Sequence, residues 1–249
     1  MRIAHDKEAL KKVLQELEEC PDNPCVSLFI AGRHIRHRHS FSHASRLADE
    51  AYNIVSHRHG HAMGREFKDR IFESYLTMSW KRDLKPGYGV GIFLSQNIAR
   101  AAAVYDLKRS FVMVAKNFHV KLLFQEIQKP IDPNWLTQIT GINPSEHHSN
   151  RLVVGLEDVA SQLPKGGMRS LILASNKILW GFCDDNTGKV ERVMNPFDTT
   201  DGDLLNHLLL WARKHTTPVA IMDCDDMPMG SPVAAIVDQE KEHDLPAVV

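Results

Sequence analysis

Cysteine is scarce in this 249-residue chain, and long apolar runs are absent. The four cysteines, at positions 20, 25, 183 and 224, form no Cys-x-x-Cys pair and no dense pattern typical of a disulfide framework. No stretch approaches the roughly 18 apolar residues that a membrane-spanning helix needs. The first residues lack the apolar core of a signal peptide. We therefore expect a soluble, cytoplasmic protein without a membrane partner.

Motifs that mark enzymes or cofactor sites are also lacking. Gly87, Gly89 and Gly91 lead into a predicted strand, whereas a nucleotide loop has the spacing GxGxxG and opens a helix. There is no HExxH, no Ser/His/Asp order typical of a triad and no paired-carboxylate motif. The sequence therefore predicts no catalytic residue, no cofactor and no metal ligand.

Charge is unevenly distributed, although the chain is nearly neutral as a whole. Residues 1–130 hold 21 Lys/Arg against 14 Asp/Glu, and residues 131–249 hold 9 against 17. A basic half beside an acidic half suits a polyanionic partner on one side and a different kind of partner on the other. The alternative is that two cores have different solvated faces.

Apolar periodicity in the first half predicts an α+β domain, residues 1–128. Leu10, Val13, Leu14 and Leu17 predict a helix over 7–19 with Asp6 as N-cap. Further helices are predicted around residues 47–55 and 67–78. Strands are predicted at 25–30, 86–94, 101–107, 111–115 and 118–124, and the last four have the spacing of an antiparallel meander.

The second half alternates helices and strands, which predicts an α/β/α sandwich over residues 151–249. Helices are expected at 156–163 and at 203–215, the latter capped by Asp201. Strands are expected at 170–174, 219–222 and 233–237, with a strand–turn–strand at 179–190. Between the halves, residues 129–150 carry Pro130, Pro133, Gly141 and Pro144 and read as a linker. The fold class is therefore α/β.

The most unusual composition lies in residues 32–61, with five Arg, seven His and only two acids. Guanidinium and imidazole groups suit phosphates and stacked bases, so one interpretation is a surface that contacts RNA. The candidate residues are Arg33, Arg36, His37, Arg38, His39, Arg46 and Arg58. A metal site is a second interpretation, but imidazoles spaced i, i+2 are scattered around a helix. A merely solvated polar loop is the third.

Several stretches resemble bacterial members of the archaeo-eukaryotic release factor superfamily. Residues 24–30, 88–95 and 118–124 resemble its N-terminal domain, and residues 179–181, 187–190, 203–205 and 227–236 resemble its C-terminal domain. The superfamily includes class I translation termination factors, the rescue factor Pelota and the hibernation factor Balon. The stretch Met227–Ile236 is the most specific of these matches.

The resemblance also implies a missing part. Full-length relatives carry a central domain, which in termination factors holds the Gly-Gly-Gln loop. Here only about 25 residues separate the two recognisable ends, too few for a domain. Gly166-Gly167-Met168 does not replace that loop, because Met lacks the amide of Gln. We therefore expect no hydrolysis of peptidyl-tRNA.

Together these features predict a non-catalytic, ribosome-associated factor acting in hibernation, rescue or protection. The N-terminal domain would contact ribosomal RNA, and the resemblance implies that the C-terminal domain contacts elongation factor Tu or a related translational GTPase. Two alternatives stay open. One is a metal-dependent hydrolase or nuclease that uses the His-rich segment. The other is a homo-oligomeric adaptor without ribosome contact, for which the methionines at 222, 227 and 229 offer a surface.

Overall fold

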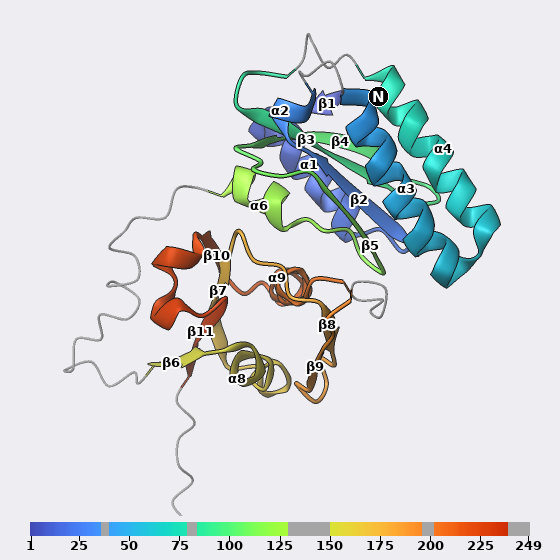
Figure 1. The fold of residues 1–249 in the computed structure, drawn as a ribbon. Coiled ribbons are helices and arrows are strands. Elements are labelled where there is room, and N and C mark those ends of the chain that lie inside the picture. The colour runs from blue at the N-terminus through green and yellow to red at the C-terminus, as the bar shows by residue number, and fades with distance from the viewer. Residues whose placement is uncertain (36–39, 79–83, 129–149, 196–201, 239–249) are drawn as a thin grey trace, which may run out of the picture. The chain divides into compact units, whose positions relative to one another are not determined.

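The structure is a computed structural model that describes residues 1–35, 40–78, 84–128, 150–195 and 202–238 (Figure 1). It confirms the α/β class. The chain forms two compact units. Unit 1 comprises Met1–Gln128, Ile178–Phe182 and Glu191–Leu210, and unit 2 comprises Lys129–Lys177, Cys183–Val190 and Trp211–Val249. The predicted domain 151–249 thus contributes two segments to unit 1, while most of the predicted linker lies outside the described residues.

Unit 1 is built on a five-stranded sheet of order β1-β4-β3-β2-β5. Neighbouring strands pair antiparallel except β1 and β4, which are parallel. The predicted meander was wrong at β5, which pairs with β2 and not with β4. The strands are β1 (Ile3–Ala4), β2 (Cys25–Ile30), β3 (Tyr88–Leu94), β4 (Ala99–Tyr105) and β5 (Phe111–Ala115).

Two long helices, α3 (Ser40–His59) and α4 (His61–Thr77), pack as an antiparallel pair on one face of this sheet (Figure 1). Because side chains alternate along a strand, Val26, Leu28 and Ile30 of β2 all point into the core under these helices. The short helix α2 (Gly32–Ile35) follows β2 directly. The helices predicted around 47–55 and 67–78 are confirmed.

Unit 1 also contains α1 (Lys7–Glu18) and α6 (Lys121–Ile127). The prediction for α1 is confirmed in detail, since the Asp6 carboxylate accepts a hydrogen bond from the Ala9 amide and the four predicted apolar residues are buried. The strand predicted at 118–124 was wrong, because this stretch contains the first turn of α6. The amides of Val120 and Lys121, at the start of α6, donate to the Asn206 side chain at 2.8 and 3.2 Å.

Asn206 belongs to α9 (Leu204–Lys214), which begins in unit 1. The predicted cap of this helix, Asp201, lies outside the described residues. Asp203 accepts hydrogen bonds from the amides of Leu205, at 3.2 Å, and Leu179, at 2.9 Å. Asp203 therefore caps α9 and also fixes the segment before β8.

Unit 2 contains a four-stranded sheet of order β10-β7-β11-β6. Its strands are β6 (Asn150–Val154), β7 (Met168–Ala174), β10 (Val219–Met222) and β11 (Val233–Asp238), of which only β6 was not predicted. Its short helices are α8 (Leu156–Ala160), η1 (Leu163–Lys165), η3 (Cys224–Asp226) and η4 (Pro228–Gly230). Strands β8 (Gly181–Cys183) and β9 (Val190–Arg192) pair across the predicted turn, and all their residues except Cys183 and Val190 belong to unit 1.

Gly166 and Gly167 connect η1 to β7. Gly166, with φ of 73°, ends η1, and Met168 begins β7 with its side chain buried. Over the described residues, no helix is both long and apolar enough to cross a bilayer.

Candidate nucleic-acid interface

One hydroxyl group joins the start of the His/Arg-rich segment to a distant loop of unit 1. Ser110, just before β5, accepts a hydrogen bond from the Ala31 amide at 2.9 Å. Its Oγ also lies 2.6 Å from Nδ1 of His34 on α2. The loop between β4 and β5 is therefore held against α2.

Glycine permits this close approach. A Cβ on Gly32 would clash with the carbonyl oxygen of Tyr88, so only glycine lets α2 rest on the backbone of β3. Gly87 has φ of 88°, a conformation that favours glycine, and its carbonyl accepts from the Asp106 amide at 3.0 Å. The backbone of three segments thus converges at one end of the sheet.

A pocket of about 290 Å³ opens where these segments meet. It is lined by Gly32, Arg33, Gly87, Asp106, Leu107 and Lys108. We call Arg33, His34, Lys108, Arg109 and Ser110 the basic site. Lys108 pairs with Asp106, but both side chains are more than half exposed, and such pairs contribute little to stability. In the described part of the chain, no carboxylate lies within ion-pair distance of Arg33 or Arg109.

A stacked histidine pair connects the basic site to α3. The rings of His34 and His43 lie 4.0 Å apart and are nearly parallel, with an interplanar angle of 7°. His43 is one turn before Arg46, which is exposed and pairs with Glu50 at 3.4 Å. Exposed cations around glycine backbone and a hydroxyl are suited to bind phosphate groups.

The three predicted RNA-binding residues that the structure describes, Arg33, Arg46 and Arg58, do not form one surface. Arg33 is in the basic site, and Arg46 follows His43, which stacks on His34 of that site, by one turn of α3. Arg58 is 15 residues beyond His43, about 22 Å along the helix. Its guanidinium donates to the carbonyl of Val114 at 2.8 Å and so braces β5. Arg36, His37, Arg38 and His39 lie outside the described residues.

The histidines at the other end of α3 do not gather at one point. Burial, with the neighbouring Arg58 charge, lowers the pKa of His59. His57 and His59 are two residues apart on a helix and therefore point in different directions. Nδ1 of His61 lies 3.2 Å from the Tyr52 hydroxyl. In the described part of residues 32–61, no three potential metal ligands come together.

Lys108 and Arg109 were missed by the sequence-based reasoning. They lie about 75 positions after α2, and nothing local indicates that Ser110 ties their loop to it. A Lys-Arg pair between two predicted strands was the available signal, but such pairs are common in exposed turns.

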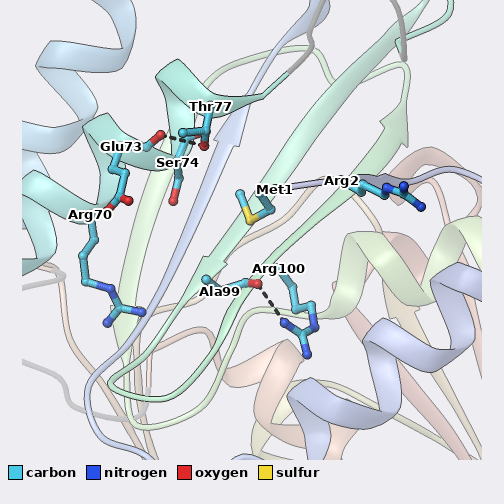
Figure 2. Close-up of a pocket in the computed structure, with 8 residues that line it drawn as sticks. All are labelled: Met1, Arg2, Arg70, Glu73, Ser74, Thr77, Ala99 and Arg100. Carbon is cyan, nitrogen blue, oxygen red and sulfur yellow. Dashed lines mark hydrogen bonds between the residues drawn. The ribbon is translucent and has the colours of Figure 1, made fainter.

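A second pocket, of about 530 Å³, is also rich in arginine (Figure 2). It is lined by Met1, Arg2, Arg70, Glu73, Ser74, Thr77, Ala99 and Arg100. Arg70 donates to the carbonyls of Ser95 and Ile98, and Arg100 pairs with Glu16. These contacts hold the β3–β4 turn and α1, so we assign no ligand to this pocket.

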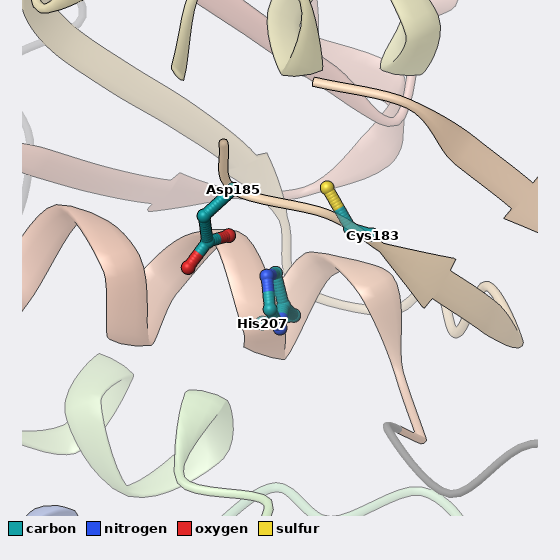
Figure 3. Close-up of side chains that lie close together, drawn as sticks. All are labelled: Cys183, Asp185 and His207. Atoms are coloured by element: carbon teal, nitrogen blue, oxygen red, sulfur yellow. The ribbon is translucent and has the colours of Figure 1, made fainter. Parts of the chain in front are cut away.

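Figure 3 shows Cys183 at the end of β8, Asp185 in the turn that follows, and His207 on α9. Cys183 and Asp185 belong to unit 2 and His207 to unit 1, so we assign no metal site to them.

Comparisons with known proteins give no family. No protein-family model matches the chain, and no curated protein is similar to it. One similar solved structure is an "Archaeal protein", 10% identical over 96% of this chain and 100% of that chain, with a TM-score of 0.36. A likeness this weak carries no argument about fold or function. The resemblance to the release factor superfamily stays a prediction.

Proposed function

We propose that the protein is a non-catalytic, ribosome-associated factor that binds ribosomal RNA through unit 1. The observation that supports this proposal best is the basic site, where Arg33 and Lys108 line a pocket together with Gly32 and Gly87, and the exposed Arg109 follows Lys108 in the chain. Such a surface suits the phosphate backbone, whose contacts position an RNA-binding protein without reading sequence. Hibernation, rescue and protection of ribosomes are all compatible with this role.

The division of charge between the units gives the proposal weaker support than the halves of the sequence suggested. Unit 1 holds 21 Lys/Arg and 18 Asp/Glu, and unit 2 holds 9 and 13. Unit 1 is only mildly basic. RNA binding should therefore depend on a local cluster of cations and not on the electrostatic potential of the whole unit. Unit 2 is the proposed surface for a protein partner, such as elongation factor Tu or a related translational GTPase.

The basic site can be tested with a charge-matched pair of variants. Replacing Arg33, Lys108 and Arg109 together by alanine should weaken binding of purified ribosomal RNA. It should also reduce the slope of log Kd against log salt concentration by about three, since each lost phosphate contact lowers this slope by about one. The control replaces Lys7, Lys11 and Lys12 on α1, which removes the same charge from exposed positions.

Sedimentation provides the test in cells. The tagged protein should migrate with ribosomal particles through sucrose gradients at low salt and partly dissociate at moderate salt. The triple variant of the basic site should stay at the top, and the α1 variant should migrate like wild type. Failure of the wild type to migrate with ribosomal particles in growing, stationary and stressed cells would refute the proposal.

A further inference from the structure

An aromatic side chain is exposed on the first turn of α3. Phe41 is 52% exposed, and its ring stacks on Phe72 of α4 with centroids 5.7 Å apart and an angle of 27°. Tyr75, which is buried, meets the same ring at 6.4 Å and 62°. Two rings from α4 therefore fix the orientation of Phe41, while about half of its surface stays in water.

We propose that Phe41 stacks against an unpaired base of a bound RNA strand, an inference that rests on the proposed function. Aromatic side chains are the usual platforms for unpaired bases, because every base has a π face. A ring that is already held loses little conformational freedom on binding. The ring thus forms a preformed platform of the right chemistry.

The charges near the start of α3 favour a nucleic acid over an apolar partner. His43 and Arg46 follow on the same helix, and the stack of His34 on His43 brings α2 with Arg33 to this end. A negatively charged strand is complementary to these groups. An apolar partner would offer these groups no complementary charge.

The helix geometry further specifies the ligand. Successive residues on a helix are rotated by about 100°, so Phe41 and His43 point roughly 200° apart. A phosphate in the basic site and a base on Phe41 can belong to one molecule only if its backbone turns around the start of α3. A flexible single strand of several nucleotides can do this, whereas a stiff duplex cannot. The platform therefore selects single-stranded RNA.

A fluorescent base reports on this contact directly. We would titrate wild type and Phe41→Ala with single-stranded RNA of about ten nucleotides, carrying 2-aminopurine at each position in turn, and with a duplex of the same sequence. Wild type should bind the single strand more tightly and quench 2-aminopurine at one or two positions. Phe41→Ala should bind roughly tenfold more weakly, in the range for loss of one base stack, and should lose that quenching.

Two further variants serve as controls. Leu76→Ala changes another exposed apolar residue, 69% exposed on α4, and should leave affinity and quenching unchanged. Phe41→Trp keeps a π face and should restore both, which excludes a folding defect as the cause in Phe41→Ala. Equal binding and quenching by wild type and Phe41→Ala would overturn the inference about Phe41 but not the proposed function.

Two other outcomes are informative. If wild type binds neither single strand nor duplex, the proposed function itself fails. If light scattering shows a dimer that Phe41→Ala converts to a monomer, the ring covers a second copy of the chain, and the inference is overturned.

Discussion

At the scale of single residues, the least expected feature is a group of buried polar side chains in unit 1. His119, Lys121 and Asp203 are each no more than 3% exposed. The Lys121 ammonium lies 3.1 Å from Oδ2 of Asp203, and Nδ1 of His119 lies 3.7 Å from the same oxygen. Removing one member of a buried ion pair leaves the other uncompensated, so this group should be sensitive to substitution.

His119 should make stability depend on pH. Burial lowers its pKa from 6.5 to about 4; Asp203 opposes this shift and Lys121 favours it. As pH falls below about 6.5, the unfolded chain binds a proton that the folded chain does not bind until about pH 4. The free energy of unfolding should therefore decrease over this range, by about 3 kcal/mol in total.

Urea unfolding at intervals between pH 7 and pH 4 measures this effect. In His119→Gln the contribution should disappear, so the variant should lose stability less steeply than wild type as pH falls. His5→Gln, at an exposed position, is the control and should keep the wild-type slope. Parallel curves for wild type and His119→Gln would contradict the assignment.

At the scale of elements, the sequence predicted correctly those features that depend only on neighbouring residues. The cap and apolar stripe of α1 are encoded within the helix itself, and both were predicted correctly. Helix α6 was mistaken for a strand because its first amides are satisfied by Asn206, about 85 positions away. The partner of β5 was also missed, since pairing with β2 depends on sheet order and not on neighbouring residues.

The packing of α3 on α4 depends on Gly64. Alanine normally stabilises a helix interior relative to glycine by about 1 kcal/mol. At Gly64, however, a Cβ would clash with Ser56 Oγ and lie 3.1 Å from the Tyr52 carbonyl oxygen. The serine can rotate but the carbonyl cannot, so the clash should outweigh the gain and destabilise the fold by about 1–3 kcal/mol.

Thermal denaturation of Gly64→Ala shows whether the clash of the added Cβ outweighs the gain in helix propensity. Gly167→Ala is the matched control, because a Cβ there meets only ordinary contacts at 3.7 Å or more. A melting temperature of Gly64→Ala equal to or above that of wild type would show that the two helices have room to separate.

At the scale of the whole molecule, two segments that follow the predicted linker belong to the first unit. Residues 178–182 and 191–210 cluster with residues 1–128, and Asp203 and Asn206 complete hydrogen bonds of the first 128 residues. The basic site could be predicted only in part for a similar reason. Arg33 stood out in composition, whereas Lys108 and Arg109 reach the site through a tertiary contact of Ser110.

This arrangement predicts that residues 1–128 do not form a fully stable domain. In that fragment Lys121 has lost Asp203, and the first amides of α6 have lost Asn206. The fragment should melt below the full chain and be cleaved faster by protease, because buried polar groups left without partners are costly.

Lys121→Leu should have opposite effects in the two contexts. In the full chain it leaves Asp203 buried without its cation and should destabilise the fold by about 3–5 kcal/mol. The fragment lacks Asp203, so its Lys121 ammonium has lost this carboxylate partner. Replacing Lys121 by leucine removes that ammonium, and the melting temperature of the fragment should rise. Thermal denaturation of the four proteins gives the comparison. Two results would contradict a contribution of residues 203–206 to the stability of the first unit. One is a fragment with the melting temperature of the full chain. The other is a Lys121→Leu substitution that changes the melting temperature in the same direction in the full chain and in the fragment.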